Sequence, residues 1–361
     1  MRGILSCILL LFSQLMVSQT TNTISTLTSQ INESSGLIYL NNTFITHNDS
    51  DNAPNLYEFN SATGNITRTV HIANAQNKDW EDLAIDETFI YIADFGNNQG
   101  NRTDLKIYRI SIADYTTTPN DTVYADSILF SYADQTDFTS STFSTKYDAE
   151  ALIAFRDSLF IFTKDWSNST TRIYSIPKTP GNYSSVKQDS INTGFLVTGA
   201  DFDTINQKIA LIGYSFNSAT VLEISNITGK ISEATLSPFA LNCSESYQVE
   251  GVAYANNNCL HISAEQHSSG AAALYELCTP NVGLTEEYEN EPRIYPNPAT
   301  DLINILLGNE EYYEIYSSIG QLLYAGKKKQ LDLGSFLKGV YTIRILTTNR
   351  QKQKTLKFIK L

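Results

Sequence analysis

Carboxylate side chains recur at one position of a repeated apolar segment. Three of these segments open with glutamate, as Glu81-Asp-Leu-Ala-Ile85, Glu150-Ala-Leu-Ile-Ala154 and Glu250-Gly-Val-Ala-Tyr254. Carboxylates that are brought together repel one another, so such a cluster needs protons, a cationic side chain or a metal ion. In an oxygen-rich site without thiols the natural ion is Ca²⁺. Glu81, Glu150 and Glu250 are therefore candidate metal ligands.

The segments that carry these residues belong to a five-fold repeat. Related apolar runs begin at Ser35 and Thr198, and in all five copies a second and a third apolar run follow. A fourth, more polar run leads to the next copy, as in residues 66–71, 122–132 and 230–236. Four short strands in each copy are typical of propeller blades. The sequence therefore predicts an all-β fold, a five-bladed β-propeller followed by a small C-terminal β-sandwich.

The two ends of the repeat region are expected to join. The fifth copy has no fourth strand after Leu277, whereas the segment Thr23–Gln30 has no partner of its own. Pairing of this segment with Leu274–Leu277 would close the ring and remove exposed strand edges.

Blade topology predicts where a binding site would lie. The first strand of each blade begins, and the second ends, at the same face of the disc, so loops at that mouth of the channel gather polar side chains. The candidate ligand-binding residues there are Glu81, Asp94, Glu150, Lys164, Asp165, Tyr214, Glu250 and Glu265. Their neighbours at the same mouth are His47, Asp49, Asp79, Asp82 and Asp148.

The roles of these residues have alternatives. Lys164 or His47 could neutralise part of the negative charge, or each glutamate could accept hydrogen bonds from backbone N–H groups and lock neighbouring blades together. Trp80 and Trp166 could stack on a sugar or an aromatic ligand, or fill space between blades. Asp203 falls on the opposite face, where we expect a turn residue.

The start of the chain predicts export. Arg2 and the apolar run Ile4–Val17 are typical of an export signal, expected over residues 1–18. No later stretch is long and apolar enough to predict a membrane span.

The two parts of the remaining chain differ in charge. Residues 294–361 carry ten Lys and Arg against five Asp and Glu, a net charge of +5. Residues 19–293 carry 14 Lys and Arg against 33 Asp and Glu, a net charge of −19. An acidic segment within residues 282–293 separates the two parts and is expected to be a linker. The total net charge of −13 argues against nucleic acid as a partner.

The last part of the chain carries a series of ordered landmarks. These are Tyr295, Pro296, Asn297 and Pro298 near its start, then Gly339 and Tyr341, and a Lys-rich close at residues 354–360. In this order they resemble the type A C-terminal sorting domain of the Bacteroidota type IX secretion system. The resemblance implies residues 294–361 as the sorting domain, the secretion translocon as a partner, and a protein released outside the cell or attached to its surface. The alternation of Ile303, Ile305, Tyr313 and Ile315 predicts strands of a small sandwich, for which an ordinary carbohydrate-binding sandwich is the alternative.

The region expected to form the propeller, residues 19–281, carries a second resemblance. Its Glu-Gly-Val-Ala and Glu-Asp-Leu-Ala openings are similar to those of lactonase-like and phytase-like propellers, which implies that an acidic residue of the first strand binds a metal. Two copies, at Ser35 and Thr198, lack this glutamate.

Three cysteines remain after removal of the export signal, namely Cys243, Cys259 and Cys278. The turn near Ser268 would place Cys259 opposite Cys278 on adjacent strands, so this pair is the expected disulfide. Pairing of Cys243 with either of the other two is the alternative.

Three classes of function fit these observations. The first is an extracellular binding module that holds a carbohydrate or another ligand at the acidic mouth, with Ca²⁺ as an expected cation. The second is a metal-dependent hydrolase of lactones or phosphate esters, in which Glu150 or Glu250 transfers the proton. The third is structural adhesion, which needs no site.

Overall fold

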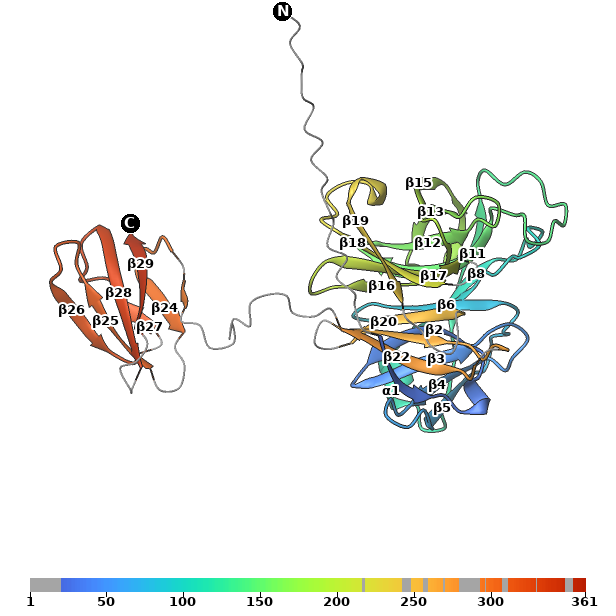
Figure 1. The fold of residues 1–361 in the computed structure, drawn as a ribbon, viewed down its shortest axis with the longest axis horizontal. Helices are drawn as coiled ribbons and strands as arrows, with labels where there is room; N and C mark the ends of the chain where they lie inside the picture. The colour runs from blue at the N-terminus through green and yellow to red at the C-terminus, as the bar shows by residue number, and fades with distance from the viewer. Residues whose placement is uncertain are drawn as a thin grey trace, which may run out of the picture. The chain divides into compact units, whose positions relative to one another are not determined.

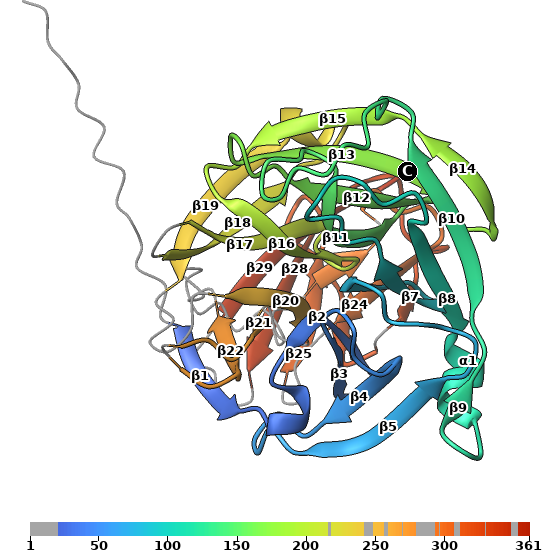
Figure 2. The same cartoon turned by 90° about the vertical axis from the view of Figure 1, so that its right-hand side faces the viewer.

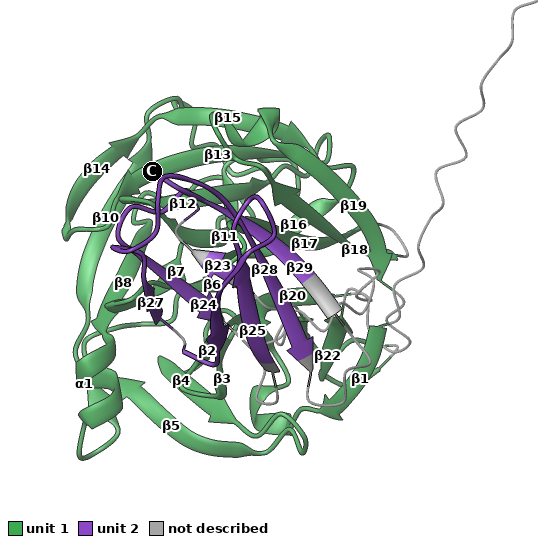
Figure 3. Cartoon of the chain, turned by 90° about the vertical axis from the view of Figure 1, so that its left-hand side faces the viewer, with its two compact units in different colours: residues 1–279 green, residues 280–361 purple. Residues whose placement is uncertain are grey.

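The chain divides into two compact units, Met1–Thr279 and Pro280–Leu361 (Figure 3). The computed structural model describes residues 21–215, 218–241, 248–255, 259–268, 270–278, 293–295, 297–306, 311–328, 330–347 and 353–361. The expected export signal, residues 282–292 of the expected linker, and Cys243 lie outside the described residues. No described helix is long and apolar enough to cross a membrane.

The described part of unit 1 contains five sheets, numbered here by their first strands. Sheet 1 contains β2 (Ser34–Leu40), β3 (Thr43–Asn48), β4 (Asn55–Phe59), β5 (Ile66–Ile72) and β9 (Thr122–Val123). Sheet 2 contains β6 (Trp80–Ile85), β7 (Phe89–Asp94), β8 (Lys106–Ser111), β10 (Asp126–Tyr132) and β14 (Gly181–Ser185). Sheet 3 contains β11 (Asp148–Phe155), β12 (Ser158–Lys164), β13 (Thr170–Pro177) and β15 (Lys187–Asn192). Sheet 4 contains β16 (Leu196–Asp203), β17 (Lys208–Ser215), β18 (Ser218–Ser225) and β19 (Thr235–Leu241). Sheet 5 contains β20 (Val249–Ala255), β21 (Cys259–Ala264), β22 (Ala273–Cys278) and β1 (Thr21–Thr26). The described helices of this unit are α1 (Ile112–Thr117) and two 3-10 turns, Ser29–Ile31 and Ile231–Glu233.

The first strands of the five sheets surround a common axis, with the later strands outside them (Figures 1 and 2). Strand β2 contacts β6, β6 contacts β11, β11 contacts β16, β16 contacts β20, and β20 contacts β2 again. These strands are largely buried, and all eight residues of β11 are buried. A closed cycle of inner strands is the arrangement of a propeller-type fold.

The predicted ring closure is confirmed. Strand β1 pairs antiparallel with β22, from Thr21 opposite Leu277 to Thr26 opposite Ala273. The first and last parts of unit 1 thus share sheet 5, and the otherwise open edge of β22 is covered.

The prediction for the fourth strands was partly wrong. Residues 122–132 do not form one strand, because β9 adds in parallel to β5 of sheet 1 and only β10 belongs to sheet 2. In the same way β14 leaves the region of sheet 3 and adds in parallel to β10. Most of residues 230–236 precede β19, which begins at Thr235. The short outer strands β9 and β14 hydrogen-bond to the preceding sheet and so join neighbouring sheets at their outer edges.

Unit 2 is a small sandwich of two sheets in its described residues. One sheet contains β23 (Arg293–Tyr295), β24 (Leu302–Leu306) and β27 (Gln330–Asp332). The other contains β26 (Leu322–Gly326), β25 (Glu311–Tyr316), β28 (Gly339–Thr347) and β29 (Gln353–Lys360). Ile303 and Ile305 of the first sheet pack in one core with Tyr313 and Ile315 of the second, which confirms the alternation predicted from the sequence.

The landmarks of unit 2 join its ends. Asn297 donates from Nδ2 to the Lys357 carbonyl at 2.9 Å and accepts from the Ile359 N–H at 3.0 Å. Tyr341 is buried and its ring stacks on Phe358 at 5.1 Å between centroids. Pro296 lies outside the described residues.

Candidate functional site

Each first strand contains a β-bulge near its start. The pairing of first and second strands skips one residue in every sheet, and the skipped residues are Gly36, Glu81, Glu150, Thr198 and Glu250. A bulge bends the strand and redirects the side chain of the extra residue. The three repeated glutamates are therefore all bulge residues. The equivalent of Glu81 in sheet 1 is Gly36, not Ser35 as the sequence alignment indicated.

Within each sheet the start of the first strand lies beside the end of the second. Trp80 at the start of β6 lies opposite Asp94 at the end of β7, and Asp148 lies opposite Lys164 in sheet 3. This end of the channel is called here the acidic mouth, defined by Asp49, Asp79, Glu81, Asp148, Glu150, Lys164, Glu250 and Glu265.

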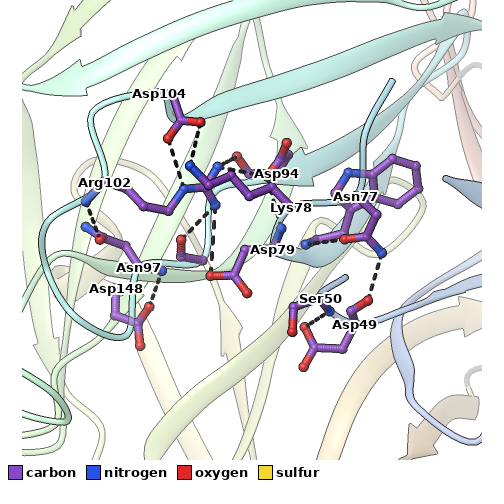
Figure 4. Close-up of polar contacts among 12 residues, drawn as sticks. Asp49, Ser50, Asn77, Lys78, Asp79, Asp94, Asn97, Arg102, Asp104 and Asp148 are labelled. Carbon is purple, nitrogen blue, oxygen red and sulfur yellow. Dashed lines mark hydrogen bonds and ion pairs between the residues drawn. The ribbon is translucent and has the colours of Figure 1, made fainter. Parts of the chain in front are cut away.

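Three carboxylates of the acidic mouth come close together. Asp49, Asp79 and Glu81 each offer an oxygen, and these oxygens all lie within 4.8 Å of one another. They come from the loop after β3, the residue before β6 and the bulge of β6, and Figure 4 shows Asp49 and Asp79 with their polar neighbours. We call these three residues the carboxylate triad. Within the described residues it shares only Glu81 with the set of metal ligands expected from the sequence.

Backbone geometry holds the triad in place. The Asp79 N–H donates to Asp94 Oδ1 at 3.2 Å, and the Gly96 N–H donates to the Asp79 carbonyl at 3.2 Å. A Cβ at Gly96 would lie 1.9 Å from Glu81 Oε1 and 2.5 Å from Asp79 Oδ2. A side chain at this position would therefore displace both carboxylates, and glycine lets the loop after β7 lie directly against them.

A second group surrounds the one lysine of the mouth. Lys164 Nζ lies 3.3 Å from Glu150 Oε2, and it lies 4.7 Å from the Trp166 ring and 5.3 Å from the Tyr214 ring. Glu250 also acts electrostatically on this lysine. The predicted role of Lys164 as a counter-charge thus fits its position, whereas Glu150 is already paired and is a poor candidate for a free metal ligand.

Arg102, which the sequence analysis missed, supplies a second buried cation. Its Nη2 lies 2.9 Å from Asp94 Oδ1, its Nη1 lies 3.9 Å from Asp79 Oδ2, and its Nη1 donates to the Gly96 carbonyl at 2.8 Å (Figure 4). Asp94 is thus occupied by Arg102 and the Asp79 N–H. Arg102 lies in the loop that follows a second strand, so the topology that selected Lys164 could also have indicated this residue.

Burial raises the pKa values of the carboxyl groups in the acidic mouth. Burial and then the neighbouring Asp49 raise the pKa of Asp79 to about 7. Burial raises the pKa of Glu250 to about 7, and burial followed by the charge of Glu250 raises the pKa of Glu265 to about 9. The pKa of Glu81 is raised by burial and by Glu150. Without a bound cation, several of these groups therefore hold protons near neutral pH.

His47 does not neutralise the cluster. Burial lowers the pKa of its imidazole to about 4, so the ring is neutral at ordinary pH. Its Nδ1 lies 2.9 Å from the Asn48 carbonyl, and its ring meets the Trp80 ring edge-on at 5.5 Å. The expectation that His47 could balance the charge was wrong because the residue is fully buried beneath the mouth.

The remaining candidates differ in burial and in role. Trp80 is fully buried and donates to the Gln76 carbonyl at 3.0 Å, so it fills space in the core and offers no stacking surface. Trp166 is partly exposed and lies 4.7 Å from the Phe143 ring. Asp165 accepts from the Ser167 N–H at 3.0 Å and stabilises a turn. Asp203 accepts from the Ile205 and Asn206 N–H groups, so it is the turn residue that was predicted.

Other residues lock the sheets together. Asp82 accepts from the N–H groups of Leu83, Leu152 and Ala200, which belong to sheets 2, 3 and 4. Asp201 accepts from the N–H groups of Phe202 and Tyr254. Asp82 and Asp201 thus join neighbouring sheets through backbone N–H groups, which is the role that one alternative gave to the repeated glutamates.

Cys259 and Cys278 form a disulfide within sheet 5, with an S–S distance of 2.08 Å. This is the pair named from the sequence. It also explains why these sulfurs and the adjacent Glu276, although close together, are not a metal site, because disulfide sulfurs are poor ligands.

The carboxylate triad fits a hard divalent cation. Ca²⁺ takes six to eight oxygens at about 2.3–2.6 Å, so two ligands of one ion lie up to about 5 Å apart. The triad meets this limit and contains no soft donor. Its three side chains would supply part of the coordination, and backbone carbonyls or a ligand would supply the rest.

Comparisons with known proteins distinguish the two units. PorZ, a surface component of the type IX secretion system of Porphyromonas gingivalis, is 13% identical, with 93% of this chain and 51% of that chain covered at a TM-score of 0.32. This chain therefore spans about half of PorZ. A luciferin-regenerating enzyme is 11% identical over 68% of this chain and 78% of its own, with a TM-score of 0.41. A nidogen/laminin complex is 14% identical over 64% and 72%, with a TM-score of 0.36. Scores of this size carry no argument about function, and no curated protein matches the chain.

Unit 2 matches a described family. Residues 293–360 match the family of secretion system C-terminal sorting domains. The sandwich that joins Asn297 to β29 and buries Tyr341 against Phe358 agrees with this match. This part of the chain is a Por secretion system C-terminal sorting domain, and the protein is exported across the outer membrane to the cell surface or the medium.

Proposed function

We propose that unit 1 is an exported five-bladed propeller that binds an extracellular ligand through a cation, expected to be Ca²⁺, held by Asp49, Asp79 and Glu81. Each of the five sheets then counts as one blade, and the cycle of contacts among the first strands supports this count. The observation that carries the proposal is the spacing of the triad, whose three oxygens lie within 4.8 Å of one another.

The energetics of the mouth support a cation. Burial raises the pKa values of Asp49, Asp79 and Glu81, and the charge of Asp49 further raises those of Asp79 and Glu81, so the ionised triad is unfavourable by itself. A divalent ion would relieve the repulsion and displace the protons. The bulge of β6 redirects the Glu81 side chain. Within the described hydrogen bonds its carboxylate has no backbone N–H partner, so it is available to bind a cation.

The rim beside the triad supports binding of a second molecule. Phe143 is 59% exposed and packs against the partly exposed Trp166. The Trp166 indole N–H is held by Asp148 at 2.8 Å, which fixes the ring. A fixed aromatic rim beside a cation suits a ligand with an apolar face and oxygen atoms that complete the coordination.

Calorimetric titration of CaCl₂ into the metal-stripped mature chain tests the proposal. We expect saturable binding with one ion per chain, and a higher melting temperature at saturating Ca²⁺. Asp79→Asn and Glu81→Gln should each weaken binding at least about tenfold. Asp157→Asn, which changes an exposed carboxylate in the turn after β11, is the matched control and should bind normally. Absence of both heat and thermal stabilisation would reject the proposal.

A metal-dependent hydrolase is the second candidate, and one observation favours it. Glu250 lies near Lys164 with a pKa raised by burial to about 7, which suits proton transfer at neutral pH. Assays of the Ca²⁺-loaded protein with bis(p-nitrophenyl) phosphate and δ-valerolactone address this candidate. Turnover that falls about 100-fold or more in Glu250→Gln would favour the enzyme. Turnover equal to that of buffer alone would count against the hydrolase and favour the binding module.

A further inference from the structure

The end of the channel opposite the acidic mouth contains a cavity of about 980 Å³. It is formed where the first strands end and turn into the second strands, and all five sheets contribute to its wall. Representative lining residues are Tyr39 of β2, Asp86 after β6, Arg156 after β11, Phe202 of β16 and Tyr254 of β20. The volume lies in the range of small-molecule sites, about 300–1,000 Å³.

The acidic groups of this wall are held apart by their own partners. Asp86 accepts from the N–H groups of Thr88 and Phe89 and lies 3.0 Å from Lys178 Nζ. Asp203 accepts from two backbone N–H groups of its turn, and Asp201 accepts from two more. Within the described residues, no group of three ligating side chains gathers at this end. The cavity therefore differs from the acidic mouth and does not suit a metal ion.

The composition of the wall narrows the class of ligand further. The carboxylates of Asp86, Glu87 and Asp203 would repel a polyanion, although Arg156 and Lys178 balance part of their charge. A wholly apolar ligand would remove water from these charged groups without offering them a hydrogen bond in exchange. The rings of Tyr39, Phe202 and Tyr254 and the side chain of Ile205, which is 86% exposed, add apolar faces.

We propose that this cavity binds a neutral oligosaccharide. The apolar face of a sugar ring packs on aromatic side chains, and its hydroxyl groups donate to carboxylates and accept from guanidinium and ammonium groups. The wall presents both kinds of surface on a rigid ring of strand ends, and its carboxylates are held in place by backbone N–H groups. Both channel ends would then be used, one with a cation and one without.

The test uses the mature full-length chain in EDTA, so that the acidic mouth is free of metal. Cellohexaose, laminarihexaose, maltohexaose and chitohexaose are each titrated by calorimetry. We expect at least one hexaose to bind with a Kd between about 10 µM and 1 mM. Thr204→Arg, which places a long side chain on the exposed turn at the cavity edge, should weaken that binding at least about tenfold.

Two control variants test whether the loss of binding in Thr204→Arg is specific to the cavity. Asn120→Arg adds the same charge on an exposed loop outside the cavity and should bind like the wild-type chain. Asp79→Asn, in the acidic mouth, should also bind normally. The inference is overturned if none of the four hexaoses binds at about 5 mM, if Thr204→Arg leaves the affinity unchanged, or if binding requires Ca²⁺ and is lost in Asp79→Asn. The last result would place the saccharide at the acidic mouth and support the proposed function instead.

Discussion

Glu81 and Asp82 are neighbours on β6, yet their carboxylates have opposite surroundings. Asp82 accepts three backbone N–H groups from three different sheets, at 2.8, 2.8 and 3.2 Å. Glu81 is the bulge residue and faces Asp49 and Asp79. The comparison teaches that a one-residue bulge can divide adjacent acids between holding the ring together and forming a site. Burial is common to both, so burial alone does not distinguish a structural carboxylate from a functional one.

Removing the structural carboxylate should have the largest effect. Asp82→Asn replaces one acceptor oxygen by an NH₂ group, which leaves one or two buried N–H groups without a partner. We expect the free energy of unfolding in urea to fall by about 2–4 kcal/mol. Glu81→Gln, measured in EDTA, should leave it unchanged or raise it, because this buried carboxyl group holds no backbone N–H group within the described hydrogen bonds and ionises only at a cost. Equal losses in the two variants would break the distinction between these neighbours.

Removing the buried guanidinium group of Arg102 should have the second largest effect on stability. Arg102→Met leaves Asp94 buried without its charged partner, so we expect a loss of about 3 kcal/mol in the free energy of unfolding. Lys78→Met is the matched control, because Lys78 pairs with Asp104 but its side chain is 53% exposed. Its effect should stay below about 1 kcal/mol. A small effect of Arg102→Met would show that the acidic mouth does not depend on this residue.

The acidic mouth should give the protein an unusual dependence on pH. The folded-state pKa values of Asp79, Glu250 and Glu265, about 7, 7 and 9, lie above unfolded values near about 4. Between these limits the folded state binds more protons than the unfolded state, so the stabilisation is complete below about pH 4 and is lost as the pH rises. In EDTA the melting temperature should therefore fall by several degrees from pH 5 to pH 9. Saturating Ca²⁺ should weaken this dependence, because the ion replaces the protons, and a melting temperature that rises over this range in EDTA would contradict the account.

The smallest effect is expected at Thr198, one of the two bulge residues that carry no carboxylate. Thr198 occupies the position of Glu81 in sheet 4, and its Oγ1 donates to the Val249 carbonyl at 2.5 Å. Thr198→Val keeps the shape and removes this donor, so we expect a loss of about 1 kcal/mol with no change in Ca²⁺ affinity. Chemical denaturation and calorimetry measure the two quantities, and a change in Ca²⁺ affinity would extend the cation site into sheet 4.

The repeat and its closure could be predicted because they depend on periodic apolar runs. The alternation in each copy predicts its strands. The fifth copy alone lacks a fourth strand, so the segment at Thr23 was expected to pair there, and β1 does pair with β22. The outer strands β9 and β14 were missed because strands of two and five residues are too short to give a periodic signal, and their pairing with the preceding sheet depends on tertiary contacts.

The membership of the site was harder to predict than its location. The sequence places Glu81, Glu150 and Glu250 at one mouth, but the bulge register and the position of Lys164 decide which carboxylates meet. Asp49 and Asp79 lie in loops whose course no periodic pattern specifies, and only loop geometry brings them to Glu81. Arg102 also lies in a loop, but the topology that places this loop at the end of a second strand could have indicated it.

Anomalous diffraction from crystals of the mature chain grown with Tb³⁺, which replaces Ca²⁺ at oxygen sites, tests the central claim most directly. The account predicts one strong peak among the carboxylates of Asp49, Asp79 and Glu81, and loss of that peak in Glu81→Gln but not in Glu150→Gln. A clear map with no peak at the triad, or with the peak at Glu150 and Glu250 instead, would contradict it.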